Sequence, residues 1–228
     1  MKLSVLVPVY NEEATVAQLL QKLLKIKEVN EIVVVNDGSQ DKSVTEIKKV
    51  QKLKNGKKIK LFSKKNGGKA TAITYGLKKA TGDYIMIQDA DLEYDPADIP
   101  ALVKIVDEGK AAVVYGSRFL GPHSNLLFWH RVGNGFLNFL VNILYNTTLS
   151  DMETCYKLIP TKLFRELDIK SKKFDMEPEI TCKILKRGIR IFEVPISYVG
   201  RDFSEGKKIT WRDGFAALKV ILLERFKS

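Results

Sequence analysis

The chain has 228 residues, of which 45% are hydrophobic, so it can form one sizeable core and is not an intrinsically disordered protein. Its 38 lysines and arginines outnumber its 27 acidic residues, and the net charge of +11 favours anionic partners without choosing among phosphates, nucleic acid and anionic lipid. The two cysteines, Cys155 and Cys182, are too few for a disulfide scaffold, and we expect them to be buried thiols in a reducing compartment.

We find no segment with a pattern typical of membrane insertion. The N-terminal apolar run is too short for a signal peptide and meets Pro8 early, so we interpret it as a first strand. The most apolar stretch, 136–145, is well below the roughly 20 residues that a membrane-spanning helix needs. We therefore expect neither a signal peptide nor a transmembrane segment.

In the first half of the chain, short apolar runs alternate with helical patterns. Such alternation is typical of βαβ units, and continuous apolar strands suit a sheet that is covered on both faces. We therefore predict an α/β fold with a mostly parallel central sheet flanked by helices. The predicted strands are 3–9, 32–35, 59–62 and 84–88, with a further apolar run at 111–115, and the predicted helices are 12–26, 43–51 and 69–80.

Residues with capping preferences mark the starts of three helices. Asn11 is placed to cap the first helix, and Ser43 with Glu46 has the spacing of a capping box. Asp95 followed by Pro96 predicts the start of a later helix, with proline at its first position.

The second half of the chain has a different pattern. Beyond about residue 122 it becomes aromatic and amphipathic, and a helix-and-strand pattern returns at 178–196. An amphipathic helix is predicted at 214–226. Because no linker or internal repeat separates these parts, we expect a single domain over 1–228.

Two carboxylates, Asp89 and Asp91, follow the predicted strand 84–88. Ligands of parallel sheets bind beyond the carboxyl ends of the strands, and side chains two apart in an extended chain point the same way. The pair can therefore share one Mg²⁺ or Mn²⁺ ion with a substrate diphosphate, while Glu93 and Asp95 add negative charge. The alternative is a solvated acidic turn. We favour the metal because the apolar strand holds the pair at the ligand-binding edge.

Two further polar segments lie at the same predicted edge. Asp37, after the second strand, is placed to bind a base or a ribose hydroxyl, or alternatively to close an Asx-turn with Gly38 and Ser39. The turn at 66–69 offers backbone N–H groups and Lys69 to a phosphate. It lacks both P-loop and Rossmann spacing, so a glycine-rich surface turn is the commoner explanation.

An ordered set of short motifs covers nearly the whole chain and resembles one family. The set is similar to family-2 glycosyltransferases of the polyprenyl-phosphate type, such as dolichol-phosphate mannose synthases. Each motif alone is weak evidence, but their order is specific. The motifs are VPVYNE at 7–12, VNDGS at 35–39, KNGGK at 65–69, DADL at 89–92, GSRF at 116–119, TCYK at 154–157, FDMEPE at 174–179, EVPI at 193–196 and GKKI at 206–209.

The resemblance implies a GT-A fold, a nucleotide-diphospho-sugar donor, Mg²⁺ or Mn²⁺, and a polyprenyl-phosphate acceptor. It assigns about 1–120 to the nucleotide-sugar and the metal, and about 121–228 to the acceptor. The implied metal ligands are Asp89, Asp91 and Glu93, the last at a position where many mannose synthases have glutamine. The implied nucleotide-binding residues are Pro8, Tyr10, Glu12, Val35, Asp37, Lys69, Asp89, Ala90, Asp91, Arg201 and Lys207, of which the last two resemble a basic clamp over the donor diphosphate.

The residues implied in catalysis are Asp89, Asp91, Arg118, Arg131 and Glu177. The two arginines would meet the acceptor phosphate. Glu177 would orient the sugar hydroxyls or the acceptor, although a capping role ahead of the Pro178 helix is an equally good interpretation.

The implied reaction is an inverting transfer of a hexose, with GDP-mannose as the favoured donor. A transferase of UDP-glucose or another UDP-sugar to polyprenyl phosphate shares every motif and is the main alternative. The QxxRW signature of processive synthases is absent, which argues against a polymerase. A non-enzymatic nucleotide- or nucleic-acid-binding protein is a remote alternative, and we expect no nucleic-acid partner because no recognised motif is present.

We also consider the hypothesis that the predicted helical segment at 126–145 contacts a membrane. Phe136, Leu140, Ile143 and Leu144 form one apolar stripe at helical spacing, which either lies in the membrane interface or packs into the core. The helix at 214–226 has the same alternatives, or docks on a membrane-anchoring partner. Because of the resemblance, we expect interfacial amphipathic helices and a peripheral protein on the cytoplasmic side of a membrane.

Overall fold

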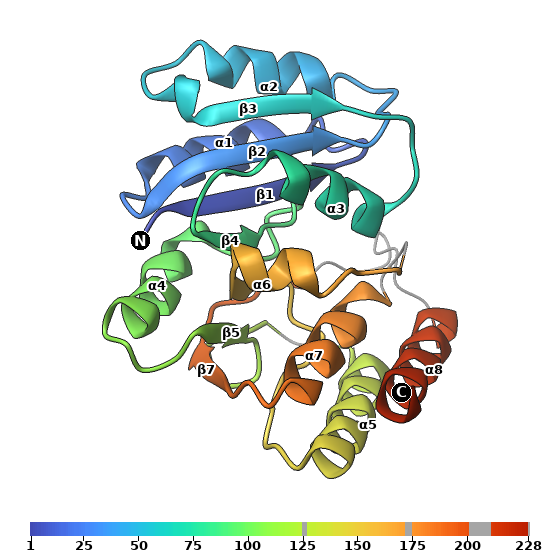
Figure 1. The fold of residues 1–228 in the computed structure, drawn as a ribbon. Helices are drawn as coiled ribbons and strands as arrows, with labels where there is room; N and C mark the ends of the chain where they lie inside the picture. Colours follow the sequence, from blue (N-terminus) through green and yellow to red (C-terminus); the bar gives the residue numbers. More distant parts are fainter. Residues whose placement is uncertain (125–126, 172–174, 201–210, 228) are drawn as a thin grey trace.

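The computed structural model describes residues 1–124, 127–171, 175–200 and 211–227, without the side chains of 211–213. Within these ranges one seven-stranded sheet has the order β3-β2-β1-β4-β6-β5-β7 (Figure 1). The strands are β1 (Leu3–Val9), β2 (Val29–Asn36), β3 (Ile59–Ser63), β4 (Tyr84–Ile87), β5 (Val113–Ser117), β6 (Lys157–Pro160) and β7 (Ile191–Pro195).

Strands β1 to β4 form a parallel block, as predicted. β1 pairs with β2 and β4, and β2 pairs with β3. In Figure 1, α3 lies in front of β1 and β2, and α1 lies behind them, so helices cover both faces, and most residues of β1, β2 and β4 are apolar and buried. The connecting helices are α1 (Val16–Lys25), α2 (Ser43–Gln51) and α3 (Lys69–Lys79).

Strand β6 is antiparallel and was not predicted. It pairs with β4 on one side and with β5 on the other, and β7 then pairs in parallel with β5. The strand is only four residues long and begins with a buried lysine, Lys157, so it shows neither an apolar run nor an alternation. The helix that follows, α6 (Thr161–Glu166), was also not predicted.

Helices α5, α7 and α8 pack against one another beside the β5 and β7 part of the sheet (Figure 1). Their shared core is separate from the main core around the sheet and includes Leu137, Val141, Cys182, Ala217 and Ile221. Among the described residues, no helix has the length and apolar composition that crossing a bilayer requires. The bounds are α4 (Ile99–Asp107), α5 (Phe128–Tyr145), α7 (Met176–Lys186) and α8 (Trp211–Phe226).

Two of the predicted helix caps are wrong. Asn11 has a φ of +55°, and its side-chain oxygen accepts a hydrogen bond from the N–H of Gln40, so that α1 begins only at Val16. Ser43 is the first residue of α2 rather than its cap, and its hydroxyl donates to Asp41. In both cases a group outside the helix bonds to the polar side chain that was expected to cap it.

Asp95 and Pro96 begin a helix, as predicted. The Asp95 carboxylate accepts a hydrogen bond from the N–H of Ala97 at 3.1 Å, and Pro96 is the first residue of the 3₁₀ turn η2 (Pro96–Asp98), which continues into α4. Proline fits this position because its missing N–H would have no partner in the first turn. Since η2 packs against α1, the segment that follows β4 is held at both ends.

Cys155 and Cys182 are buried and form no disulfide, as predicted. Burial raises the pKa of the Cys182 thiol to about 12. The thiol therefore stays protonated at neutral pH, and it is a packing group rather than a nucleophile.

Candidate active site

Asp89 and Asp91 lie directly after β4, at the carboxyl edge of the parallel block, and both are half-buried. Asp89 Oδ2 accepts a hydrogen bond from Lys69 Nζ at 2.8 Å, and Asp91 Oδ1 accepts one from the N–H of Glu93 at 3.2 Å. Leu92 has a φ of +65°, which turns the chain sharply after the second carboxylate. The arrangement presents hard oxygen donors on a rigid base.

Lys69, the first residue of α3, lies between two carboxylates. Its Nζ is 2.8 Å from Asp89 Oδ2 and 3.8 Å from Glu177 Oε1. Burial by itself lowers the pKa of Lys69, but the charge of Asp89 raises it well above the usual value. Lys69 is therefore cationic, and its ion pair reflects the negative potential that the carboxylates create at this edge.

Glu93 connects the segment after β4 to the chain after β7. Its Oε2 accepts a hydrogen bond from the Tyr198 hydroxyl at 2.7 Å, and burial together with the Glu93 charge raises the pKa of Tyr198. In the described part of the chain, no three His, Cys, Asp or Glu side chains are grouped closely enough to hold a metal by themselves. A metal at Asp89 and Asp91 would thus need phosphate oxygens as well, as Mg²⁺ commonly does.

Asp37 holds the glycine-rich turn in place. Its carboxylate accepts hydrogen bonds from Lys64 Nζ and from the N–H groups of Gly67 and Gly68. The Asx-turn interpretation of Asp37 is wrong, because the side-chain oxygen of Asn36 accepts the N–H of Ser39 instead. The expectation that these glycine N–H groups face a phosphate is also wrong, because the buried Asp37 carboxylate occupies them.

The other residues predicted for the nucleotide lie at the ends of β1, β2 and β4. Tyr10 is 39% exposed, and Pro8 and Glu12 are half-buried. Val35 and Ala90 are buried, at 1% and 4% exposure. For these two residues, only the backbone is available to a nucleotide.

Arg118 and Arg131 meet at one aromatic ring. Arg118 makes a bidentate ion pair with the buried Asp151, with Nε to Oδ2 at 2.8 Å and Nη2 to Oδ1 at 2.7 Å. The Arg131 guanidinium lies 3.8 Å from the centre of the Phe119 ring, and that of Arg118 lies 5.6 Å from it. The fold thus brings together two cations that are separated in sequence, beyond the carboxyl end of β5.

A buried ion pair lies beneath Lys69. Lys157 on β6 is fully buried, and its Nζ lies 2.6 Å from Glu177 Oε2 and also donates to the carbonyl of Thr154. Glu177 in turn reaches Lys69 through its other oxygen. Lys157 lies in the motif TCYK at 154–157, but its ion pair was not predicted, and neither was that of Asp151, because their partners Glu177 and Arg118 are distant in sequence.

Two predictions concern the last third of the chain. Glu177 is the second residue of α7, whose N-cap position is Asp175, so the capping interpretation of Glu177 is wrong. Arg201 and Lys207 lie outside the described residues, and the basic clamp therefore stays a prediction.

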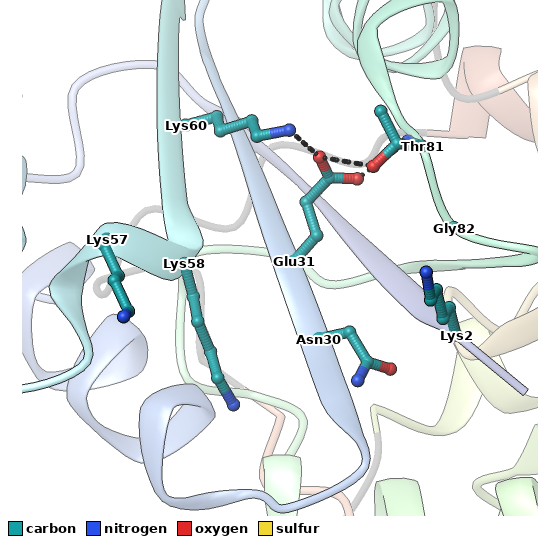
Figure 2. A pocket seen from close by; sticks show the side chains of 8 residues that line it. All are labelled: Lys2, Asn30, Glu31, Lys57, Lys58, Lys60, Thr81 and Gly82. Carbon is teal, nitrogen blue, oxygen red and sulfur yellow. Dashed lines mark hydrogen bonds and ion pairs between the residues drawn. The ribbon is translucent and has the colours of Figure 1, made fainter.

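A basic cavity of about 280 Å³ opens at the opposite, amino edge of the sheet (Figure 2). Four of its lining residues are lysines, of which Lys60 pairs with Glu31. The Glu31 carboxylate also accepts hydrogen bonds from Ser4 and Thr81. A strand as long as β1 rises about 3.3 Å per residue, so roughly 20 Å separates the two edges. The cavity is therefore not part of the site around Asp89.

Two curated proteins are similar to this chain. An undecaprenyl-phosphate 4-deoxy-4-formamido-L-arabinose transferase from Proteus mirabilis is 36% identical over 112 residues, covering 47% of this chain and 34% of that protein. The low-salt glycan biosynthesis hexosyltransferase Agl6 from Haloferax volcanii is 29% identical over 227 residues, covering 97% of this chain and 53% of that protein. The chain thus spans from a third to about half of the length of these relatives.

Solved structures share the fold. Glucosyl-3-phosphoglycerate synthase from Mycobacterium tuberculosis, in complex with Mn²⁺, uridine diphosphate and phosphoglyceric acid, has a TM-score of 0.76 at 17% identity, over 99% of this chain and 78% of that chain. S. aureus TarS, in complex with UDP-GlcNAc, has a TM-score of 0.67 at 20% identity, over 98% of this chain and 66% of that chain. These likenesses confirm the predicted GT-A-like fold. The family model for glycosyl transferase family 2 matches residues 4–168, well over half of the sequence, and the chain belongs to that family.

Proposed function

We propose that this chain transfers a hexose, with inversion, from a nucleotide-diphospho-sugar to a polyprenyl phosphate at a membrane surface. One observation carries the proposal: the carboxylate pair Asp89 and Asp91 and the arginine pair Arg118 and Arg131 both lie beyond the carboxyl ends of strands. The first pair suits a metal-bound diphosphate and the second suits another phosphate. The Proteus mirabilis relative, which is named for undecaprenyl phosphate, supports the choice of acceptor.

Asp89 and Asp91 would hold Mg²⁺ or Mn²⁺. The carboxylate oxygens fit such an ion because they are hard donors at the end of a rigid strand, where Asp89 already attracts a cation. Bound there, the ion would supply charge stabilisation for the departing nucleotide diphosphate. Complexes of glucosyl-3-phosphoglycerate synthase with Mn²⁺ or Mg²⁺ and uridine diphosphate support this expectation.

The two arginines would bind the acceptor phosphate. Asp151 uses the Nε and one terminal nitrogen of Arg118, which fixes the guanidinium plane and leaves other N–H donors of the five. Arg131 lies over Phe119 and reaches the same place. The chain's own contribution is therefore to align a phosphate oxygen with the anomeric carbon of the donor.

The proposed acceptor needs no strong general base. A phosphate monoester has its second pKa near ~6, so it is mostly ionised and nucleophilic at neutral pH. Displacement by one phosphate oxygen inverts the configuration at the anomeric carbon in a single step. The task left to Arg118 and Arg131 is therefore to bind and position the ionised phosphate.

Two kinds of nucleotide-sugar are candidates for the donor. GDP-mannose is suggested by the resemblance to dolichol-phosphate mannose synthases. This chain has Glu93 at a position where many of those synthases have glutamine. A UDP-hexose is favoured by the solved structures, since those of glucosyl-3-phosphoglycerate synthase and TarS contain uridine nucleotides. Both donors present the same diphosphate to Asp89 and Asp91.

A matrix of donors and acceptors tests the function and separates the donors. GDP-mannose and UDP-glucose are each incubated with the chain, Mg²⁺ or Mn²⁺, and dolichyl or undecaprenyl phosphate, and the released nucleotide diphosphate is measured. We expect release that requires both the metal and the lipid phosphate, with one donor preferred by about tenfold or more. Faster turnover of UDP-glucose would refute the mannose assignment, and release from neither donor would refute transfer of these sugars.

Exposed apolar side chains on α5 and α8 support a peripheral membrane location. On α5, Phe139 and Ile143 are each 61% exposed, and on α8 Phe226 is 75% exposed. The predicted stripe is divided, because Phe136 and Ile143 are exposed whereas Leu140 and Leu144 pack on the core between the helices. The exposed part, with Arg131 at its end, suits the boundary between lipid headgroups and acyl chains, on the cytoplasmic side that the family resemblance implies.

Replacement of Phe139 by aspartate tests the membrane contact. Because a buried phenylalanine contributes about 1.5–3 kcal/mol, we expect Phe139→Asp to weaken binding to phosphatidylglycerol-containing vesicles by roughly tenfold in a sedimentation assay. Leu53→Asp is the matched control, since Leu53 is 50% exposed and follows α2, a helix that lies far from α5 in Figure 1. Equal losses in both variants would mean that only charge matters, and would contradict the proposed contact.

A further inference from the structure

Two carboxylate oxygens near the proposed site are enclosed and have no hydrogen-bond partner. They are Glu153 Oε1 and Glu177 Oε1, and the only other such side-chain atom among the described residues is the hydroxyl of Tyr145. A buried polar atom without a partner destabilises the fold by about 1–3 kcal/mol unless a ligand or water satisfies it. Two such atoms in one charged cluster indicate a place where a ligand supplies hydrogen-bond donors.

Along the chain, Glu153 lies between Asp151, which pairs with Arg118, and Lys157, which pairs with Glu177. Burial raises the pKa of its carboxyl to about 7, and the charges that act on it next are Lys157, Glu177, Arg118 and Asp151. Lys157 and Glu177 belong to the cluster beneath Lys69, on the donor side, whereas Arg118 and Asp151 lie on the acceptor side. In an inverting transfer, the sugar ring occupies the space between the leaving and the attacking phosphates.

The charges of the cluster determine which kind of chemical group can bind there. A phosphate would be repelled by two glutamates, and a second metal ion would be repelled by the Lys157 ammonium, which is 2.6 Å from Glu177 Oε2. A sugar hydroxyl is neutral, and it can donate to a carboxylate or accept from a protonated carboxyl. Glu153 as a whole is only half-buried, so part of the residue borders solvent.

We propose that Glu153, together with Glu177, forms a subsite that binds hydroxyl groups of the transferred sugar and makes Glu153 a specificity-determining residue. This inference rests on the proposed function, because it places the hexose of the nucleotide-sugar between the two glutamates. The subsite distinguishes a hexose with free ring hydroxyls from one in which those hydroxyls are removed or substituted.

Calorimetric titration with matched ligands tests the subsite. GDP, GDP-mannose, UDP and UDP-glucose are titrated in the presence of Mn²⁺ into the unaltered chain, Glu153→Gln and the control Glu108→Gln, which changes an exposed carboxylate after α4. We expect Glu153→Gln to weaken the preferred nucleotide-sugar by about tenfold and to change the affinity for its nucleotide diphosphate by less than about twofold. The control should bind both ligands like the unaltered chain.

Two results would overturn the subsite: equal losses for the nucleotide-sugar and the nucleotide diphosphate, or no loss for either. Donors that lack one ring hydroxyl each are titrated into the unaltered chain, so that a folding defect of the variant does not affect the test. At least one of them should bind about tenfold more weakly, and uniform affinity would also overturn the proposal. If the nucleotide-sugar binds through Glu153 but no sugar reaches a polyprenyl phosphate, the proposed function fails while the subsite stands.

Discussion

Asp91→Asn is expected to reduce metal-dependent sugar transfer by roughly 100-fold or more, without unfolding the chain. The amide keeps an oxygen that can accept the N–H of Glu93, which the carboxylate accepts at 3.2 Å, so the local turn survives. What is lost is one negative charge of the proposed metal site, where charge stabilisation is worth several kcal/mol in the transition state. The initial rate of nucleotide diphosphate release over a Mn²⁺ titration measures the effect.

Asp95→Asn is the matched control for this experiment. Asp95 belongs to the same acidic segment, but its carboxylate faces the N–H of Ala97 and the ammonium of Lys22 rather than the site. Its replacement should leave the rate within about twofold. A rate that is unchanged in Asp91→Asn, or that falls equally in both variants, would remove Asp91 from the proposed metal site.

The parallel half of the fold was predictable because its signals are local. An apolar run such as 32–35 indicates a strand that is buried on both faces. The carboxylates of Asp89 and Asp91 directly follow another such run. Their place at the carboxyl edge therefore follows from the parallel arrangement alone. The same logic located Asp37 at this edge, although not its partners.

The partners could not be predicted because they come from distant parts of the chain. Asp37 binds the N–H of Gly67, 30 residues away, and Lys157 binds Glu177, 20 residues away. Similarly, Asn11 prefers the N–H of Gln40 to a capping role. A polar residue bonds to the partner that the fold brings nearest, and the residues beside it in the sequence do not identify that partner.

The apolar stripe of α5 illustrates a limit of periodicity. Spacing places Phe136, Leu140, Ile143 and Leu144 along one side of a helix, but it does not say how wide the buried face is or which neighbours cover it. Because α7 and α8 both pack against α5, the core takes Leu140 and Leu144 and leaves the other two side chains exposed. The core alternative is thus correct for Leu140 and Leu144, and the membrane-interface alternative stays a prediction for the two exposed side chains.

We expect a second large effect when the ion pair of Lys157 and Glu177 is broken, because both side chains are buried. Replacing Lys157 by methionine fills a similar volume but leaves the Glu177 carboxylate with only Lys69, at 3.8 Å. Breaking a buried pair by removing one partner typically costs about 3–5 kcal/mol. The exposed pair of Lys104 and Glu108 provides the control, and Lys104→Met should cost no more than about 1 kcal/mol.

Guanidinium unfolding of Lys157→Met, Glu177→Leu and the double variant measures this pair through a double-mutant cycle. We expect Lys157→Met to lower the free energy of unfolding by about 3–5 kcal/mol, and the double variant to lose less than the sum of the single variants, since no unpaired charge then remains. The Lys157 ammonium also lies 4.9 Å from the centre of the Tyr115 ring, a contact that the double variant does not restore. Strictly additive losses would show that the two residues act independently, and that Lys157 does not hold Glu177 in place for the proposed sugar subsite.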